Sequence, residues 1–359
     1  MTIAIPYANL RALLPALVLV SVNVTSQLGP IVQLFAVAVI LVILSGHIQI
    51  ERSLAWVALF YFLACIFLGY LAYGPHQAVL KAGKLFLFVT ASLLTVKGAS
   101  TGNRLPALIA LRAFLCLCAA NALLALAMGD SIFRAYYLIE YSIYSAYTIS
   151  ILVFLARPLL TVPDRITAYV FLALCGSTMG LLLLLIAEVI GRKLRPRMIL
   201  GLSALAPVGI LALHFLMEFR GKSLTLEYLL ESDRGNLFST FFDTTATAFT
   251  FSNWIFGRGV GTPLHHFITP DRGFNDYLIR LGEGEVFSFC LHNEALRILC
   301  DFGLFGLLIV GLRLWKVCPI PVLALLVIGM LTNSYLYSFS GALIASGLFH
   351  PRNEEPLHA

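Results

Sequence analysis

One stretch carries the residues best suited to chemistry, from His292-Asn293 to Gly306, where a long polar loop meets an apolar segment. Read as a helix, it places four residues on one face at separations of 7, 11 and 14 positions: His292, Leu299, Gly303 and Gly306. A histidine in the first turn lies at the positive end of the helix dipole, which disfavours the imidazolium and attracts anions. A neutral histidine there suits a general base that acts on a phosphorylated substrate. A boundary histidine on a packing helix is the alternative, and position alone favours it.

A glycine-rich turn precedes this stretch, with the sequence Gly257-Arg258-Gly259-Val260-Gly261. Alternating glycines allow backbone N–H groups to converge on an anion, and an arginine among them can bind phosphate oxygens through two hydrogen bonds. The pattern fits a flexible turn equally well, and no strand precedes it as a dinucleotide site would require.

A metal site is suggested only by the adjacent histidines His265-His266 with Asp271 nearby. Adjacent side chains point in different directions in most backbones, and no spaced carboxylate pair completes a set of ligands. No Asp-x-Asp sequence occurs in the chain. We expect no metal and no cofactor.

The composition is that of a membrane protein. Of the 359 residues, 60% are hydrophobic and 12% are charged, and the mean hydropathy is +0.91. A soluble domain could not bury so much apolar surface. The basic residues behind the net charge of +6 lie mostly in short gaps between apolar runs, which is the positive-inside pattern and not a nucleic-acid-binding face. The seven cysteines show no metal spacing and no disulfide framework.

The apolar runs predict a polytopic all-α bundle, because a bilayer crossing needs roughly 20 apolar residues. Candidate segments are 10–27, 29–45, 53–73, 79–96, 105–128, 141–157, 159–191, 198–217, 293–312 and 319–349. The first segment lacks a clear cleavage site and is expected to remain as a membrane helix. The stretches 159–191 and 319–349 are each interpreted as two helices, which turn near Gly176-Ser177 and Asn333-Ser334. The total is then about 12 transmembrane helices, with both termini inside.

The basic gaps predict the orientation of this bundle. The densest basic cluster is placed in the cytoplasm and consists of Arg192, Lys193, Arg195 and Arg197. Arg313 and Lys316 follow two crossings later and fall on the same side, so the loop between faces the outside. We therefore predict three regions: an N-terminal transmembrane bundle (1–217), an outer loop (218–291) and C-terminal transmembrane helices (292–359).

An amphipathic helix is expected within the loop, where Ser232 or Asp233 can act as its N-cap. The aromatic residues that follow keep near-helical spacing: Phe238, Phe241, Phe242, Phe249 and Trp254. Such a helix would lie along the membrane surface with its aromatic side toward the bundle. Packing of these aromatics is favoured over a role in sugar stacking.

These features together resemble the bacterial O-antigen ligases. The signature of that family is His, then Asn, Ser or Gln, nine residues, Gly, two residues, and Gly, Thr or Tyr. Residues 292–306 match it at every defined position. The wider family includes polysaccharide polymerases and protein O-oligosaccharyltransferases, which move a glycan off a polyprenyl diphosphate on the outer face of the inner membrane. The resemblance is good from about Ser232 to Ser334 and only architectural before that.

The resemblance implies a GT-C-like fold in the bacterial inner membrane, with a periplasmic, metal-independent active site. His292 would be the general base. Arg234 matches the arginine that opens the family's catalytic loop and is expected to bind the lipid diphosphate, with Arg258 second and Arg280 third. Gly259 and Gly261 would contribute to the same binding turn. Packing of the motif helix falls to Asn293, Gly303 and Gly306, since glycines on a membrane helix let a neighbouring backbone come close.

One position departs from the family pattern. Family members usually carry Ser-Arg followed by Thr or Gly at the hairpin turn before the loop, and that arginine is thought to contact the diphosphate. The matching turn here is Gly176-Ser177-Thr178-Met179-Gly180, without an arginine. A second positive charge could come from Arg258, Arg280, Lys81 or Lys84; otherwise binding is weaker, or the chain is a divergent or inactive relative. We favour compensation.

The expected reaction transfers a glycan from undecaprenyl diphosphate to a hydroxyl of a lipid A-core sugar or of another growing chain, with inversion. One large loop, where O-antigen polymerases commonly have two, favours a ligase of lipopolysaccharide biosynthesis; an exopolysaccharide or O-antigen polymerase is the alternative. A transporter of lipid-linked oligosaccharides is the alternative from another class, and a scaffold in a polysaccharide assembly complex is a third. The expected partners are the lipid-linked donor, the acceptor, the bilayer and possible assembly proteins, without nucleic acid.

Overall fold

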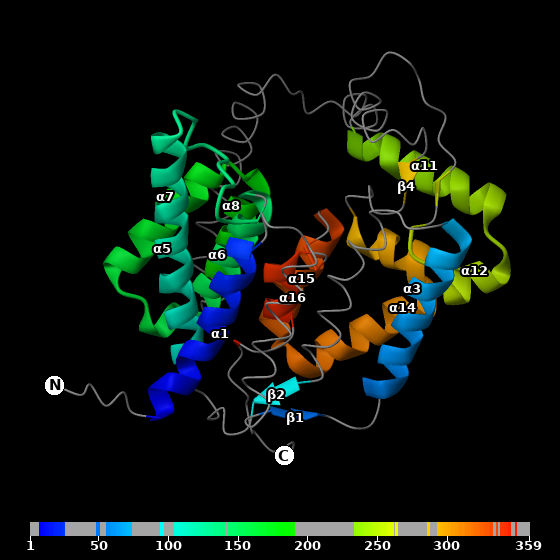
Figure 1. The fold of residues 1–359 in the computed structure, drawn as a ribbon, viewed down its shortest axis with the longest axis horizontal. Helices are drawn as coiled ribbons and strands as arrows, with labels where there is room; N and C mark the ends of the chain where they lie inside the picture. The colour runs from blue at the N-terminus through cyan, green and yellow to red at the C-terminus, as the bar shows by residue number, and fades with distance from the viewer. Residues whose placement is uncertain are drawn as a thin grey trace, which may run out of the picture.

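The computed structural model is mostly helical in the part of the chain that it describes, and the strands there have two or three residues each (Figure 1). It describes residues 7–25, 48–50, 55–73, 94–96, 104–140, 142–190, 233–261, 263–264, 286–287, 293–332, 335–336, 338–345 and 349. Strand β1 (Ile48–Ile50) pairs antiparallel with β2 (Leu94–Val96), and β3 (Pro263–Leu264) pairs antiparallel with β4 (Val286–Phe287). This architecture agrees with the predicted all-α class.

Five predicted membrane segments are helices where the sequence places them: α1 (Tyr7–Val24), α3 (Ala55–Tyr73), α5 (Leu105–Ala127), α6 (Ser142–Ala156) and α14 (Glu294–Val317). Among the described residues, α5 and α14 are the two helices long and apolar enough to cross a membrane, with 23 and 24 residues. The predicted segments 29–45 and 198–217 lie outside the described residues, and the count of about 12 crossings stays a prediction.

The remaining helices are η3 (Arg157–Leu159), α7 (Val162–Cys175), α8 (Thr178–Ile190), α11 (Asp233–Ala248), α12 (Phe251–Phe256), α15 (Ile320–Thr332) and α16 (Phe339–Ala345). The predicted division of 159–191 into two helices is confirmed, because Gly176 ends α7 in a left-handed conformation with a φ of 58°. The stretch 319–349 likewise contains two helices, α15 and α16, although the predicted break at Asn333-Ser334 lies outside the described residues.

One predicted membrane segment, 79–96, does not end as a helix. Its last three residues form β2, because they pair with β1 and both strands consist mainly of branched or apolar side chains that suit a strand. The pairing places the residues that follow segment 29–45 beside the end of segment 79–96.

The amphipathic helix predicted in the loop is α11, which begins at Asp233. It ends at Ala248 because the side chain of Thr250 caps a separate helix, α12, and accepts the Asn253 N–H at 3.3 Å. Of the aromatic residues, Phe241 is buried but Phe242 is exposed. The aromatic positions therefore do not form a single buried face.

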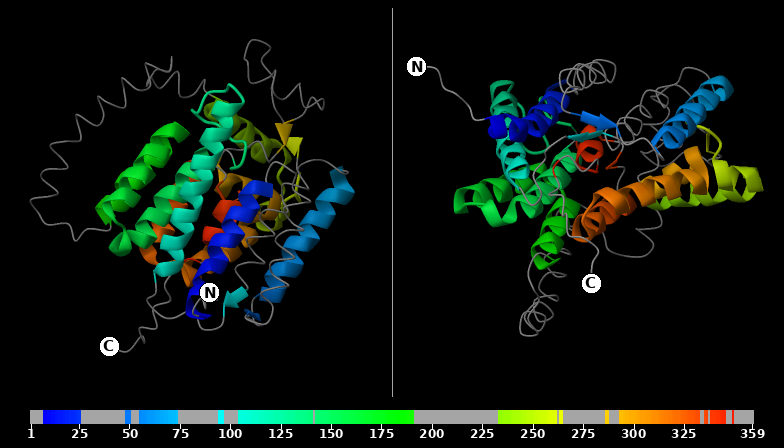
Figure 2. Two further views of the ribbon diagram at one scale, coloured as in Figure 1. Left: turned by 60° about the vertical axis from the view of Figure 1, so that its left-hand side comes forward. Right: turned by 90° about the horizontal axis from the view of Figure 1, so that it is seen from below.

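The helices gather around α6, which contacts α5, α7, α8, α15 and α16. A second group, α3, α11, α12 and α14, lies on the other side of α15 and α16, as both Figure 1 and Figure 2 show. In Figure 1, α11 and the β3–β4 pair lie at the opposite end of the molecule from the β1–β2 pair.

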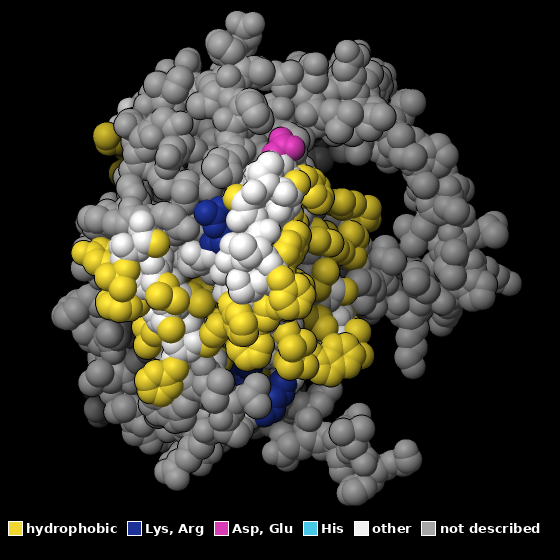
Figure 3. Space-filling model, turned by 90° about the vertical axis from the view of Figure 1, so that its right-hand side faces the viewer, with side chains coloured by type: hydrophobic (Ala, Val, Ile, Leu, Met, Phe, Trp, Pro, Cys, Tyr) yellow, Lys and Arg dark blue, Asp and Glu magenta, His cyan; other side chains and the backbone are white. Residues whose placement is uncertain are grey.

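The second group exposes a broad apolar face. Figure 3 shows hydrophobic side chains crowded over this side of the molecule. Large exposed hydrophobic residues of the second group come from three helices: Phe60, Leu63, Phe67 and Leu71 of α3, Phe251 and Phe256 of α12, and Leu304, Phe305, Leu308 and Leu312 of α14. A face of this kind is costly in water and suits contact with lipid.

Candidate functional site

The start of α14 is fixed by the two residues that follow His292. Asn293 is the N-cap: its side-chain oxygen accepts a backbone N–H of the first turn at 3.1 Å, and its Nδ2 donates to the Leu331 carbonyl at 3.2 Å. Glu294 is fully buried, and its carboxylate accepts the Leu336 N–H at 2.7 Å. The helix that carries the signature is therefore anchored to α15 and to the segment after it.

Of the four charged residues predicted for the site, the structure describes the backbone of Arg234 and the side chain of Arg258. His292 and Arg280 lie outside the described residues, so the general base and the third arginine stay predictions. Arg234 is the second residue of α11, and its side chain is not among the described ones. Arg258 is half-buried, and its Cζ lies 5.9 Å from the centroid of the Phe249 ring.

Gly303 interrupts α14. Its backbone angles, φ 64° and ψ −172°, are non-helical, so two helical segments meet there at a kink. A side chain is strained at this φ, and a Cβ would lie against the Ile255 carbonyl and 2.5 Å from the Gly257 nitrogen. The backbone of residues 255–257 therefore lies directly against Gly303. The single helical face predicted for Leu299, Gly303 and Gly306 is wrong, because the kink breaks the helical periodicity between them.

The turn 257–261 packs into this break. Carbonyls beside a helix break need partners from outside the helix. The Cys300 carbonyl accepts the Arg258 N–H at 2.9 Å, and the Asp301 carbonyl accepts the Gly259 N–H at 3.2 Å. The polar loop and the signature helix are thus joined by backbone hydrogen bonds.

These hydrogen bonds contradict the prediction that the backbone N–H groups of the turn bind an anion. The N–H groups of four consecutive residues donate to protein carbonyls at 2.8–3.3 Å: Gly257, Arg258, Gly259 and Val260. Their hydrogens are therefore not directed at a phosphate, and Gly259 acts in packing. Gly261 is buried and has a φ of 84°. Any binding of an anion by Arg258 falls to its side chain.

Helix α3 holds the same turn from the other side. The Tyr61 hydroxyl donates to the Phe302 carbonyl at 2.6 Å and lies 3.0 Å from the Phe256 carbonyl. Gly69 leaves room for the Val260 backbone, since a Cβ on Gly69 would overlap the Val260 carbonyl. Three consecutive carbonyls of α14 at the break therefore have donors from the turn or from α3. Nothing in the sequence near Tyr61 indicates this role.

Three charged residues of α14 belong to the site but were missed by sequence reasoning. Glu294, Arg297 and Asp301 are 0%, 3% and 0% exposed. Their spacing of 3 and 4 residues places them on one helical face, and Arg297 Nε lies 4.0 Å from Asp301 Oδ2. Ionisable residues inside an apolar helix are rare and usually functional. This spacing within the predicted segment 293–312 is the signal that could have identified them.

A second buried polar cluster connects α1 and α16 with the loop between α5 and α6. Glu140 of that loop accepts the Ser340 N–H at 2.9 Å, and its own N–H donates to Asn23 Oδ1 at 3.0 Å. Asn23 Nδ2 donates in turn to Ser340 Oγ at 3.0 Å. Glu294 accepts the N–H of Leu336, just before α16, and Glu140 accepts that of Ser340 in the first turn of α16, so both carboxylates bind the start of this helix. Glu140 carries no recognisable motif, so the sequence alone does not assign it.

A metal site finds no support in the part of the chain that the structure describes, where no three His, Cys, Asp or Glu side chains lie together. The histidine pair His265-His266 lies outside that part, as do Asp271, Lys81 and Lys84. The predictions made for those residues from the sequence therefore stay predictions.

Comparison with known proteins does not place the chain in a family. No protein-family model matches it, and no curated protein matches it either. An assignment of function therefore depends on the residues of the chain and on their geometry.

Proposed function

We propose that this protein is a membrane glycosyltransferase of the O-antigen ligase type. It moves a glycan from undecaprenyl diphosphate to a hydroxyl of an acceptor sugar, on the lipid A core or on another growing chain. Its site faces the periplasm from the bacterial inner membrane. One observation carries the proposal: the turn 257–261 of the polar loop is hydrogen-bonded to the break at Gly303 in the signature helix.

The defined positions of the signature have physical roles in this geometry. Asn293 caps α14, and Gly303 permits the break that receives the turn. Gly306 lies one turn further along, where a Cβ would come 3.7 Å from the Tyr61 ring. The fixed spacing between these positions therefore sets how far the start of α14 lies from the turn that carries Arg258. Because the signature positions fix where the loop turn meets α14, they support a site that the loop and the helix share.

The proposed reaction is a single displacement. His292 takes the proton of the acceptor hydroxyl while its oxygen attacks the anomeric carbon. The new carbon–oxygen bond forms as the bond to the diphosphate breaks, so the anomeric centre inverts and undecaprenyl diphosphate leaves. Arg234 and Arg258 stabilise the negative charge that accumulates on the departing diphosphate. Because the leaving group is already activated, neither a nucleotide nor a metal is required.

The distribution of buried charge favours an enzyme over a transporter. A transporter is expected to carry charged residues deep within several helices. Among the described residues, the buried charged ones are Glu140 in a loop and Glu294, Arg297 and Asp301 in α14. Buried charge thus concentrates on the one helix that receives the loop.

The substitution His292→Ala tests the mechanism. We expect it to reduce transfer of a labelled glycan from its lipid carrier by about 10²- to 10⁴-fold, since it removes the general base. The assay uses the purified protein in detergent, where an enzyme transfers label and a transporter cannot. Unchanged thermal unfolding of the variant would show that its fold is intact. Transfer at close to the wild-type rate would rule out His292 as the base.

A polymerase of the same family is the alternative function. A deletion strain distinguishes the two by the glycan that remains on the carrier lipid. Loss of a ligase leaves long polymer on the carrier, whereas loss of a polymerase leaves single repeat units.

A further inference from the structure

The turn that follows α12 meets α3 far from the outer end of that helix. Helix α3 has 19 residues, or about 28 Å, which is close to the thickness of the hydrocarbon core. It begins shortly after β1, and Figure 1 places α11 at the opposite end of the molecule from β1 and β2, so Tyr73 is the outer end of α3. The Val260 N–H donates to the Cys65 carbonyl at 3.3 Å, which lies about 12 Å along the axis from Tyr73. The turn therefore lies beside the middle of α3.

The end of α12 lies at least as deep along α3. The Tyr61 hydroxyl is 3.0 Å from the Phe256 carbonyl, and Tyr61 lies about 18 Å along the helix axis from Tyr73. Half of the hydrocarbon core is roughly 15 Å thick. A segment that only covered the outer surface of the membrane would not reach this level.

The backbone of the turn has the hydrogen bonds that such a depth requires. In the hydrocarbon core, irregular backbone is stable only where protein groups satisfy its polar atoms. The N–H groups of residues 257–260 donate to carbonyls of α12, α14 and α3 at 2.8–3.3 Å. None of these four groups depends on water, so the turn can lie within the membrane.

Helix α12 also carries exposed side chains that suit lipid. Phe251 is 83% exposed and Phe256 is 56% exposed, on a helix of six residues. The Phe256 ring lies edge-on to Phe305 of α14 with the centroids 6.4 Å apart, and it continues the apolar face of the second group in Figure 3. Exposure of these rings to water is unfavourable, whereas acyl chains match them.

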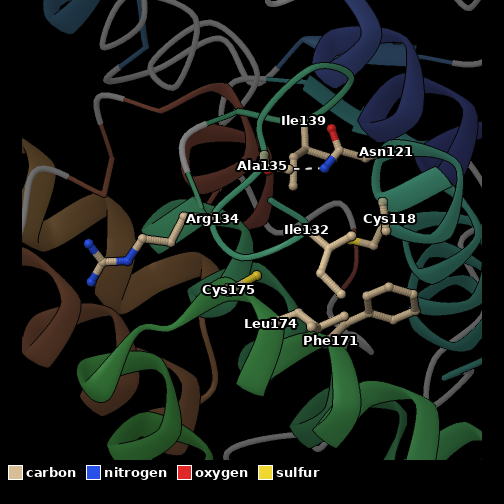
Figure 4. A pocket seen from close by; sticks show the side chains of 10 residues that line it. Cys118, Asn121, Ile132, Arg134, Ala135, Ile139, Phe171, Leu174 and Cys175 are labelled. Carbon is tan, nitrogen blue, oxygen red and sulfur yellow. Dashed lines mark hydrogen bonds between the residues drawn. The ribbon is translucent and has the colours of Figure 1, made fainter. Parts of the chain in front are cut away.

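One charged residue lies between Phe249 and Gly261, and its side chain is directed back along the chain. Arg258 is half-buried, with its guanidinium carbon 5.9 Å from the centroid of the Phe249 ring at the junction of α11 and α12. A long basic side chain can hold its charge near the membrane surface while its backbone lies deeper. Arg134, between α5 and α6, differs because it is exposed, and Figure 4 shows its guanidinium pointing away from the hollow beside it.

We propose that residues 251–261 form a re-entrant segment, which enters the outer leaflet and packs its exposed phenylalanines against acyl chains of the bilayer. Helix α11 stays at the membrane surface. The region 218–291, predicted to be an outer loop, thus has a middle part that lies within the membrane. There the turn supplies hydrogen bonds to the carbonyls at the break in α14, where water could not. The inference depends on α3 crossing the membrane and is independent of the reaction assigned to the site.

Two other surroundings of α12 predict different contacts. If α12 lay above the lipid headgroups, positions 251 and 256 would face water. If a second copy of the chain covered this face, both positions would be shielded from water and from lipid. A probe that distinguishes water, lipid and protein therefore separates the three arrangements.

The test uses the full-length protein in vesicles of phosphatidylethanolamine and phosphatidylglycerol. A nitroxide is attached to Phe251→Cys and, separately, to Phe256→Cys. Electron paramagnetic resonance then measures its collisions with oxygen, which concentrates among acyl chains, and with a water-soluble nickel chelate. Two exposed positions are the matched controls: Asp243→Cys on α11 for water and Leu308→Cys on α14 for lipid. The wild-type chain, treated in the same way, gives the background from its seven cysteines.

The ratio of oxygen collisions to nickel collisions decides the outcome. We expect this ratio at positions 251 and 256 to be several-fold higher than at position 243 and close to that at position 308. A ratio equal to that at position 243 would place α12 in water and overturn the proposal. Few collisions with either reagent would also overturn it, because a protein surface would then cover the helix. Unfolding temperatures close to that of the wild type confirm that each labelled variant is folded.

Discussion

At Tyr61 a single hydroxyl joins three helices. It lies within hydrogen-bond distance of the carbonyls of Phe256 in α12 and Phe302 in α14, and Tyr61 itself belongs to α3. A hydroxyl has one hydrogen to donate, and the shorter distance of 2.6 Å assigns that hydrogen to Phe302. The residue next to the break in the signature helix therefore depends on a side chain 241 positions away.

The substitution Tyr61→Phe tests this dependence. It removes the donor and leaves the Phe302 carbonyl without that partner, so we expect the free energy of unfolding to fall by about 1–3 kcal/mol. The measurement is thermal or denaturant unfolding of the purified protein. The matched control is Tyr70→Phe, because Tyr70 lies on the same helix and is 46% exposed. Identical unfolding of the two variants would contradict the role of the Tyr61 hydroxyl.

Residue identities in the site were predictable where they depend on neighbours in the sequence. Asn293 and Gly303 stand out by their place in a fixed pattern, and both have structural roles there. Tyr61 and Glu140 could not be identified in this way, because their partners come from distant segments. The residues next to a tyrosine or a glutamate in the sequence do not indicate that it makes such a contact.

At the scale of elements, α14 differs most from expectation. The apolar run 293–312 predicts one continuous helix, and the structure places helical segments on both sides of Gly303. A glycine in an apolar helix is equally compatible with close packing of another helix. Gly303 is the site of a break because N–H groups of the turn 257–261 donate hydrogen bonds to the α14 carbonyls at that point. Helix periodicity contains no information about such a partner.

Two glycines of the same helix provide a matched pair of substitutions. Gly303→Ala places a Cβ at a φ of 64° against the backbone of residues 255–257, so we expect it to displace the turn and to abolish transfer. Gly311→Ala meets nothing within 4 Å and should be neutral, or stabilising by about 0.5–1 kcal/mol, because alanine favours the helix. Unfolding and transfer assays on both variants check the contrast. Equal behaviour of the pair would mean that the break is not required.

At the scale of the whole molecule, the order of helices along the chain followed from hydropathy, whereas their arrangement did not. Apolar runs located α1, α3, α5 and α6 closely because each is set by local composition. The separation into two groups around α15 and α16 depends on contacts between distant helices (Figure 1). The buried polar cluster of Asn23, Glu140 and Ser340 joins α1, the loop before α6 and α16, and it has no periodic signal in the sequence.

The orientation of the bundle can be tested with single cysteines. Asp243→Cys lies on the exposed surface of α11, and Arg104→Cys lies at the exposed start of α5. If the polar loop faces the periplasm, an impermeant maleimide should label position 243 in intact spheroplasts and position 104 only after the membrane is opened. The wild-type chain controls for labelling of its own cysteines. The reverse pattern would invert the bundle and place the loop in the cytoplasm.

The break at Gly303 also decides which parts of this protein can be exchanged with those of a relative. A chimaera that replaces the outer loop alone would leave the carbonyls of Cys300 and Asp301 facing a foreign turn whose amides are not spaced to meet them. A chimaera that carries over residues 233–317 together would keep both sides of the junction. Loop and helix are therefore one transplantable piece, and a change in either is tolerated only when the other changes to match it.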